Sequence, residues 1–334
     1  MPRGKIPVDL LEEVVFKHLG VDRPEVVLGP SAGIDGAVIE SGGRSLIFSM
    51  DPITGALERI GWLAVNVNAN DVATFGVKPA ILFSCILLAQ DSDRKEVETI
   101  CAQMDEAARK LGIAIAGGHC EVTPGLTSPI VVGCILGITE KGRYVTAAGA
   151  KNGDKLILTK SAGIEGTAIL ASDREEPLRK KLSNTAVRKA KNLFNQTSVV
   201  EDAITAFTTG GVDAMHDPTE GGVIGGIYEM AEASNVGVKV FEARIHVQPE
   251  TQSICRFFHI NPLQLVSSGA LLIAAKPDAT GKIVEDLRQK RIRASVIGSF
   301  VSDPKERTLI SRDGTVQVLP RPASDQLWRA LAET

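Results

Sequence analysis

The sequence predicts an α/β protein of two domains, from its length, its composition and the order of its elements. The chain has 334 residues, enough for two domains of ordinary size. Hydrophobic residues make up 44% and charged residues 23%, as in globular proteins with a large core. The 32 glycines and the 4% of aromatic residues suit a fold with many tight turns between strands and helices, and both halves of the chain mix the two.

In the first half, apolar runs of strand length are separated by helical stretches. Residues 80–89 form a continuous apolar run, which predicts a strand covered on both faces. The helix over 93–111 begins with acids and ends with Arg109 and Lys110 before Gly112, as the helix dipole favours. A helix over 58–75 ends at Gly76. The other predicted elements are a helix over 7–19, with its apolar side packed inward, and strands over 26–28, 37–40, 45–50, 113–116 and 130–138.

The second half restarts after 139–154, where Gly, Lys and Asn accumulate. We therefore expect an N-terminal domain over 1–150 and a C-terminal domain over 151–334. Asp313-Gly314 predicts a hairpin turn between two terminal strands. The expected strands are 155–159, 212–215, 238–241, part of 265–275, 295–300 and two within 308–318, and the helices are one opened by 161–167 and those over 175–193, 198–208, 223–233 and 283–290.

Composition excludes several classes of function. The net charge is -3 and the pI about 6.0, so a basic face for nucleic acid or anionic membrane is not expected. The five cysteines form no CxxC pair, and no zinc or disulfide framework follows from them. The longest apolar runs are too short for a bilayer, and no signal-peptide region is present. We expect a cytoplasmic protein.

Three acids in the first half, Asp35, Asp51 and Asp71, follow strands or sit in a helix beside Gly, Pro or Asn. Taken alone, Asp71 is most simply a capped or paired acid. As a set, such carboxylates are typical ligands of Mg²⁺, which shares them with phosphate oxygens. Two glycine-rich turns are expected, over 29–36 (including Gly33) and at 117–118, and their N–H groups suit an anion. A nucleotide with a metal fits this pattern, although P-loop and dinucleotide fingerprints are absent from the sequence.

Other candidate residues allow either a role in a binding or catalytic site or a structural role. His119 follows Gly117 and Gly118, and either serves a site there or is a turn histidine bonded to backbone. His216 either belongs to a site or hydrogen-bonds at a helix start. Asp217 either complements a helix dipole or, with Gly221 and Gly222, belongs to a helix start that holds a phosphate or carboxylate. Lys5 lies in a short basic N-terminal tip.

In order along the chain, these pieces resemble one superfamily. It contains aminoimidazole-ribonucleotide synthase, selenophosphate synthetase, thiamine-monophosphate kinase and the hydrogenase expression/formation protein E branch, and the last is the most similar. The resemblance covers nearly the whole chain. The matching stretches are Gly4–Pro7, Asp35–Val38, Asp51, Asn70–Ala73, Gly76–Pro79, Gly117–His119, Lys160–Thr167, Asp217–Gly222 and Ser267–Ile273.

The resemblance implies a homodimer in which N-terminal domains pair strands, with ATP in a cleft partly across the dimer interface. It implies that Asp35, Asp51 and Asp71 hold Mg²⁺ on the phosphates. Asn70 would orient Asp71 or touch the nucleotide. It also implies that Gly117, Gly118 and His119 approach the nucleotide and that Lys5 lies over the phosphates.

Two departures bear on function. Relatives often carry Gly-Asp-Asp where this chain has Gly33-Ile34-Asp35. The carbamoyl dehydratases of the branch carry substrate on a C-terminal cysteine, whereas the last cysteine here is Cys255. We therefore expect an ATP-dependent enzyme that phosphorylates an oxygen of a small molecule or of a partner-borne group. The alternatives are a small-molecule kinase resembling thiamine-monophosphate kinase, and a non-catalytic nucleotide-binding scaffold for a maturation partner.

Overall fold

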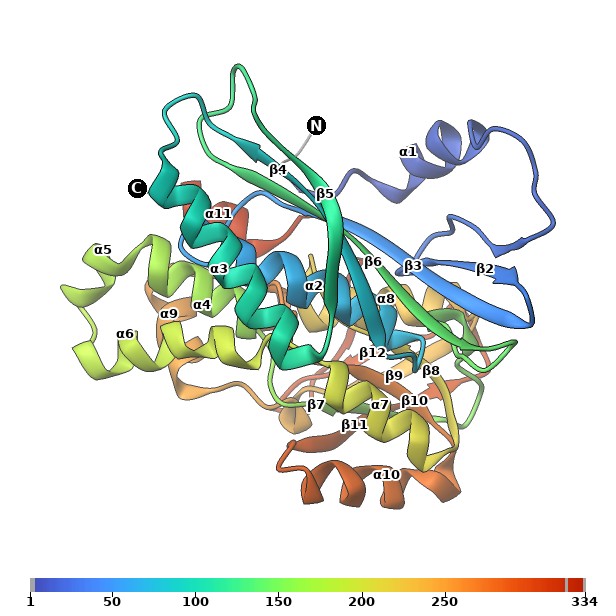
Figure 1. Cartoon of the computed structure of the whole chain (residues 1–334). Helices are drawn as coiled ribbons and strands as arrows, with labels where there is room; N and C mark the ends of the chain where they lie inside the picture. Colours follow the sequence, from blue (N-terminus) through green and yellow to red (C-terminus); the bar gives the residue numbers. More distant parts are fainter. Residues whose placement is uncertain (1–3, 322–323, 333–334) are drawn as a thin grey trace.

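The computed structural model describes residues 4–321 and 324–332, and its strands form two sheets (Figure 1). The first sheet has the order β1-β2-β3-β6-β4-β5, and β4 and β5 are its parallel pair. In that order the strands are β1 (Val26–Leu28), β2 (Ala37–Ser41), β3 (Arg44–Ile53), β6 (Ile130–Glu140), β4 (Pro79–Leu88) and β5 (Ala114–Val122).

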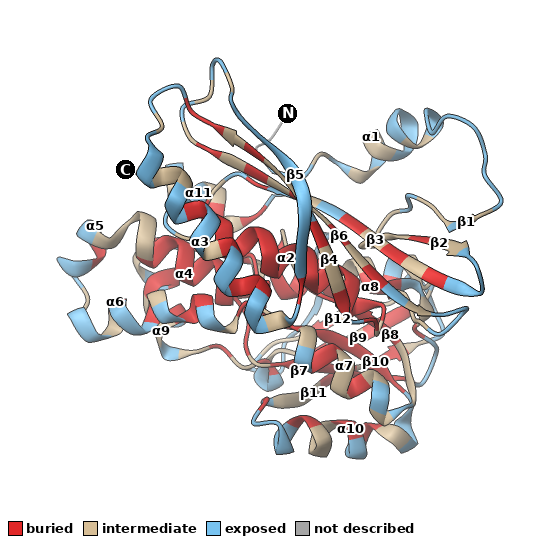
Figure 2. Ribbon diagram, viewed as in Figure 1, coloured by how far each residue is buried: buried red, intermediate tan, exposed pale blue. Residues whose placement is uncertain are grey.

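Helices α2 (Ile60–Thr74) and α3 (Arg94–Leu111) cover one face of this sheet, and every residue of α2 is buried (Figure 2). Asp93 caps α3 by accepting from the N–H of Glu96, and Gly112 ends that helix in the left-handed conformation. The other face of the sheet exposes apolar side chains, including Met50, Phe83 and Ile138. The prediction that 80–89 is covered on both faces is therefore wrong for this chain alone.

The second sheet is covered on both faces and has the order β13-β12-β9-β11-β7-β10-β8. Helices α7 (Val200–Thr209) and α10 (Pro277–Gln289) pack on one face, and α8 (Gly222–Ala233) packs on the other. The strands, in the order of the sheet, are β13 (Val316–Val318), β12 (Arg307–Ile310), β9 (Gly237–Phe241), β11 (Ala294–Val301), β7 (Lys155–Thr159), β10 (Leu272–Ala275) and β8 (Val212–His216).

A group of helices joins the two sheets, because one hydrophobic cluster runs from α2 into α4 (Ile164–Asp173) and its neighbours. The neighbours are α5 (Glu175–Arg179), α6 (Asn184–Lys191), α9 (Pro249–Phe257) and α11 (Gln326–Ala332). Of the described helices, none combines the length and the apolar character needed to cross a membrane.

Four predicted elements differ from the structure. The helix over 7–19 is only α1 (Val8–Glu13) with a 3₁₀ turn after it, and Val14 and Val15 stay exposed because α1 lies out on the surface (Figure 1). Strand β3 continues beyond residue 50 to Ile53, so Asp51 pairs within the sheet opposite Gly133. The stretch 175–193 is two helices and the start of a 3₁₀ turn. Gly117 and Gly118 lie inside β5 rather than in a turn.

Candidate metal and nucleotide site

Four carboxylates from separate elements gather where the two domains meet. Asp51 lies on β3, Asp71 on α2, Asp35 just before β2 and Asp217 just after β8. Burial and the charges of Asp51, Asp217 and Asp35 raise the pKa of Asp71 well above its usual range. The structure thus brings the three predicted acids together and adds Asp217 to them.

Local hydrogen bonds fix the first-domain acids in place. The Ser49 hydroxyl donates to Asp71 Oδ2 at 2.6 Å. The Asn68 amide clamps the backbone of Asp51: its Oδ1 accepts from the Asp51 N–H at 2.9 Å and its Nδ2 donates to the Asp51 carbonyl at 3.2 Å. The Thr74 hydroxyl lies 3.3 Å from Asp35 Oδ2 and 2.7 Å from the Asp71 carbonyl oxygen. Asn68 and Thr74 of α2, together with Ser49 of β3, therefore hold these three acids in position.

Among the four acids, Asp217 stands out because its buried carboxylate lacks, within the described chain, hydrogen-bond partners that would stabilise its charge. It is 0% exposed, and neither carboxylate oxygen has a hydrogen-bond partner among the described residues. Burial, reinforced by the charges of Asp35 and Asp51, raises its pKa to about 8. A buried carboxylate without a donor or cation is unfavourable. Oxygen donors of this kind are what Mg²⁺ prefers, so the residues present fit the metal that the sequence predicted.

His216 supplies one internal cation to this cluster. Its Nδ1 lies 2.8 Å from Asp35 Oδ2 and its Nε2 lies 3.1 Å from Glu229 Oε2. Burial alone would lower the pKa of the imidazole, but these two carboxylates raise it well above its usual range. A carboxylate oxygen therefore faces each ring nitrogen, an arrangement that favours the imidazolium form, in which both nitrogens donate.

Asp35, His216 and Asp217 also place one ligand atom each within 4.8 Å of one another. An imidazolium has no lone pair for a metal, so the carboxylates are the candidate ligands.

Lys5 supplies a second cation. Its backbone N–H donates to Glu220 Oε2 at 2.8 Å, and its ammonium lies in the field of the cluster. Burial of that ammonium would lower its pKa, but the charges of Glu229, Asp35, Asp51 and Asp71 raise it overall. Gly4 permits this path, since it has a φ of +95° and a Cβ there would lie 2.4 Å from a Glu220 oxygen. The structure places Lys5 beside the acids, and its position over the phosphates of a nucleotide stays a prediction.

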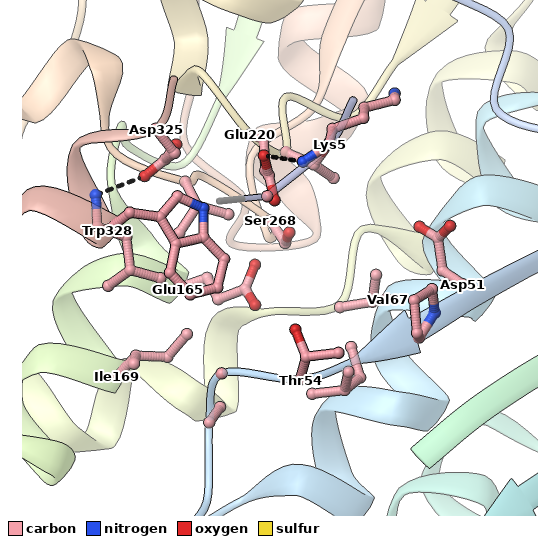
Figure 3. Close-up of a pocket in the computed structure, with 18 residues that line it drawn as sticks. Lys5, Asp51, Thr54, Val67, Glu165, Ile169, Glu220, Ser268, Asp325 and Trp328 are labelled. Carbon is pink, nitrogen blue, oxygen red and sulfur yellow. Dashed lines mark hydrogen bonds between the residues drawn. The ribbon is translucent and has the colours of Figure 1, made fainter. Parts of the chain in front are cut away.

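Two cavities flank the Lys5 segment. The first, of about 390 Å³, extends from Asp51 past Glu165 to Trp328 on α11 (Figure 3). The second, of about 610 Å³, lies between α1, α8 and the turn that contains Gly33. Gly33 has a φ of +73°, and a Cβ there would lie 3.2 Å from the Glu229 carbonyl oxygen, so its backbone passes close to α8. The predicted glycine thus borders a cavity large enough for a ligand.

The helix start at Gly221 and Gly222 already binds a carboxylate side chain of the protein itself. The Gly221 N–H donates to Asp325 Oδ2 at 2.7 Å. A Cβ on Gly222 would lie 2.7 Å from the carbonyl oxygens of Leu263 and Leu265, so this glycine serves close packing. The carboxylate of Asp325 occupies the position where the sequence suggested a ligand phosphate or carboxylate.

The structure pairs the side-chain amide of Asn70 with the backbone of the second domain, and a contact with the nucleotide stays a prediction. Asn70 is 0% exposed, its Nδ2 donates to the Thr197 carbonyl at 2.8 Å, and its Oδ1 accepts from the Val199 N–H at 2.8 Å. Both ends of its amide are therefore used to tie α2 to the second domain. Its neighbour Asn68, which sequence reasoning missed, is the one that orients a site acid.

Gly117, Gly118 and His119 lie apart from the acids. The strand pairing aligns His119 with Cys85, Cys85 with Val132 and Val132 with Pro52, so three strand spacings, about 14 Å, separate His119 from the Asp51 end of β3. His119 is exposed and lies 3.0 Å from Glu121 Oε2. A Cβ on Gly118 would lie 1.8 Å from the Ser84 carbonyl oxygen, so the glycine serves the close pairing of β5 with β4 at an irregularity in their register.

Family models and similar proteins agree on one family for this sequence. The model of the AIR synthase related protein N-terminal domain matches residues 33–139, and that of the C-terminal domain matches residues 151–311. A putative hydrogenase expression/formation protein of Methanocaldococcus jannaschii is 27% identical over 98% of this chain and 96% of its own length. The carbamoyl dehydratase HypE of Escherichia coli is 27% identical over 89% of this chain and 88% of its own length.

Solved structures show the same fold. A chain of a HypE–HypF complex matches with a TM-score of 0.76 and 22% identity, covering 94% of this chain and 99% of that one. HypE in complex with ATP matches with a TM-score of 0.73 and 22% identity over 98% and 97% of the two chains. AaThiL complexed with AMPPCP and TMP matches with a TM-score of 0.73 and 18% identity over 96% of this chain and 98% of that one. At these identities the likeness concerns the fold.

Proposed function

Because this chain belongs to the family of AIR synthase related proteins, we propose that it is an ATP-dependent enzyme of the hydrogenase-maturation type. It transfers the γ-phosphoryl group of ATP to an oxygen of a small molecule or of a group carried by a partner protein. The bond between that oxygen and the γ-phosphorus forms while the bond from the γ-phosphorus to the bridging oxygen breaks; ADP leaves, and a hydroxyl acceptor loses its proton to solvent. The acceptor oxygen, once phosphorylated, is a good leaving group.

The observation that carries this proposal is the convergence of four carboxylates at the domain junction, where the oxygens of buried Asp217 have no hydrogen-bond partner among the described residues. Asp35, Asp51, Asp71 and Asp217 would hold Mg²⁺, which supplies neutralisation of the charge on the phosphate oxygens. Lys5 adds a cation beside the same phosphates. His216 keeps Asp35 and Glu229 in place through its two ring nitrogens. Phosphoryl transfer needs mainly positioning and charge neutralisation, and these groups provide both.

The partners of the proposed enzyme follow from the same family. HypE forms a complex with HypF in a solved structure, which supports a maturation protein as a partner of this chain. The apolar face with Met50, Phe83 and Ile138, left uncovered on the first sheet, supports pairing with a second copy. We propose a homodimer assembled through this face.

The test is ATP turnover with Mg²⁺ in a metabolite screen that reads ADP and AMP separately. Asp71→Asn should lower the turnover at least about 100-fold, because one charge-stabilising group is lost. Asp105→Asn, an exposed change on α3, is the matched control and should leave it unchanged. Equal turnover by Asp71→Asn and wild type contradicts the proposal. AMP in place of ADP contradicts the proposed phosphoryl transfer.

A further inference from the structure

The cavity between Asp51 and Trp328, called here the acceptor cavity, adjoins the acid cluster, because Asp51 of that cluster lines one end of it; Gly4 and Lys5 line it too. Its volume of about 390 Å³ falls in the range of small-molecule sites. Figure 3 shows Asp51 at one end, Trp328 at the other and Glu165 between them. Its walls include the apolar side chains of Ile53, Ala56, Val67, Ile169 and Val266.

The polar lining of this cavity is strongly acidic. The carboxylates of Asp51, Glu165, Glu220 and Asp325 line it, and Lys5 is the one Lys or Arg among the described residues that do so. Glu220 already accepts from the Lys5 N–H. Asp325 already accepts from the N–H groups of Gly221 and Leu327. Glu165, in contrast, lies between the two ends of the cavity and pairs with no cation in the described part of the chain.

The surroundings of Glu165 leave hydrogen-bonding capacity unused. Glu165 is 7% exposed, and burial raises its pKa to about 7. The Ser268 hydroxyl is 0% exposed and close enough to Glu165 to lower its pKa against the larger effect of burial, although the two do not reach full hydrogen-bond geometry and no other described residue pairs with this hydroxyl. The indole N–H of Trp328 is likewise buried with no partner among them. Buried polar groups are normally paired, so these three groups are suited to a bound polar molecule.

We propose that the acceptor cavity binds the phosphoryl acceptor and that this acceptor carries a cationic nitrogen group, such as a protonated amine, which pairs with Glu165. This inference rests on the proposed function. A ligand cation would supply the charge that buried Glu165 lacks. An aliphatic stem suits the apolar walls, and the acceptor oxygen would point to the Asp51 end, where the phosphates are proposed to lie. An acceptor bearing a phosphate or carboxylate would face four carboxylates and is disfavoured.

The test uses three alcohols of equal length and different charge: 4-aminobutan-1-ol, butane-1,4-diol and 4-hydroxybutyrate. Their dissociation constants are measured by calorimetry without ATP, for wild type, Glu165→Gln and the exposed control Glu98→Gln. Wild type should bind the amine at least about tenfold more tightly than the diol, and the carboxylate most weakly. Glu165→Gln should remove the preference for the amine, and Glu98→Gln should keep it.

Three outcomes overturn the inference: binding of the diol equal to that of the amine, tighter binding of the carboxylate, or no binding of any of the three at millimolar concentration. The wild-type series alone decides this if Glu165→Gln does not fold. Turnover of Mg-ATP is measured separately with Asp71→Asn. A preference for the amine without any turnover therefore contradicts the proposed function alone, whereas turnover without that preference contradicts the inference alone.

Discussion

Asp71 and Asp217 at the domain junction lie in surroundings opposite to those of His119 on β5, although all three were candidates for one site. The two acids are buried among other carboxylates, and burial raises the pKa of Asp217 to about 8. His119 is exposed on an edge strand and contacts Glu121, two residues along the same strand. A protein tolerates unfavourable buried charge where it is needed for function. The residues of β5 are all exposed, so this strand carries no buried charge.

The comparison teaches that position relative to the domain junction separates the candidates better than residue type does. The acids act through groups from both domains, such as His216 of β8 with Asp35 before β2, which lie 181 residues apart. The β5 stretch contacts β4 and helix α3 of the same domain, and His119 itself lies beside Glu121 of its own strand. Changes at the junction should therefore alter function and stability together, and changes on β5 should not.

The largest effect is expected for Asp217→Asn. Turnover of Mg-ATP should fall at least about 100-fold, because a proposed metal ligand is lost. Without metal the variant should be more stable than wild type, since the raised pKa of about 8 means that folding opposes ionisation of this acid. That opposition appears as pH rises above the unfolded value near 4 and is complete above about 8, so the gain should widen over this interval.

Thermal unfolding at several pH values, with and without Mg²⁺, measures how much stability the substitution gains without metal and how much stabilisation by the metal it loses. Mg²⁺ should raise the melting temperature of wild type more than that of Asp217→Asn. A variant that is less stable than wild type at pH 8 without metal would show that other groups fully offset the cost of burying the Asp217 charge.

Next in size is the loss of the internal cation. His216→Gln leaves Asp35 and Glu229 without the group that bridges them, and should cost about 3 kcal/mol of unfolding free energy at neutral pH. Mg²⁺ should restore part of this loss, because it offers Asp35 a replacement charge. Denaturant unfolding measures both, with the exposed His18→Gln as control. An unchanged stability would contradict the bridging role.

Much of the site could be predicted from sequence because the local chemistry of Asp35, Asp51 and Asp71 is unusual for structural acids. In the sequence, each lies beside Gly, Pro or Asn at a predicted strand end, in a turn or in a small-residue helix. The partners that position them could not be predicted in the same way. Ser49 lies 22 residues from Asp71, and Glu229 meets Asp35 only through His216, so tertiary packing alone brings them together.

The fold shows the same division. The helix over 93–111 was predicted well, because its cap, charges and terminal glycine are all local signals. Gly117 and Gly118 were predicted as a turn, because a glycine pair favours turns and the close approach of the Ser84 backbone cannot be seen in sequence. The exposed apolar side of 7–19 was predicted as buried, since periodicity shows an apolar face without showing what covers it.

A smaller effect, confined to stability, is expected for Asn70→Ala. The change leaves the Thr197 carbonyl and the Val199 N–H unpaired in a buried place, which should cost about 2 kcal/mol. The KM for ATP should stay within about twofold, because this side chain points to the second domain and not to a ligand. Asn66→Ala, whose amide donates to the Trp62 carbonyl of its own helix, is the matched comparison. A rise in KM with normal stability would return Asn70 to the nucleotide site.

The smallest effect is expected for His119→Ala in a single chain. An exposed pair such as His119 with Glu121 is worth less than about 1 kcal/mol, and about 14 Å separate this strand from the Asp51 end of β3. Stability and turnover should therefore stay close to those of wild type if each chain completes its own site.

A large loss of turnover in His119→Ala would instead mean that β5 reaches the acid cluster of a second copy, as the family resemblance implies. Mixing His119→Ala with Asp71→Asn then separates the two cases. In a shared site, each mixed dimer keeps one intact pair of Asp71 and His119, so random mixing restores roughly a quarter of wild-type turnover. If each chain completes its own site, mixing adds nothing beyond the average of the two variants, because neither subunit can repair the other.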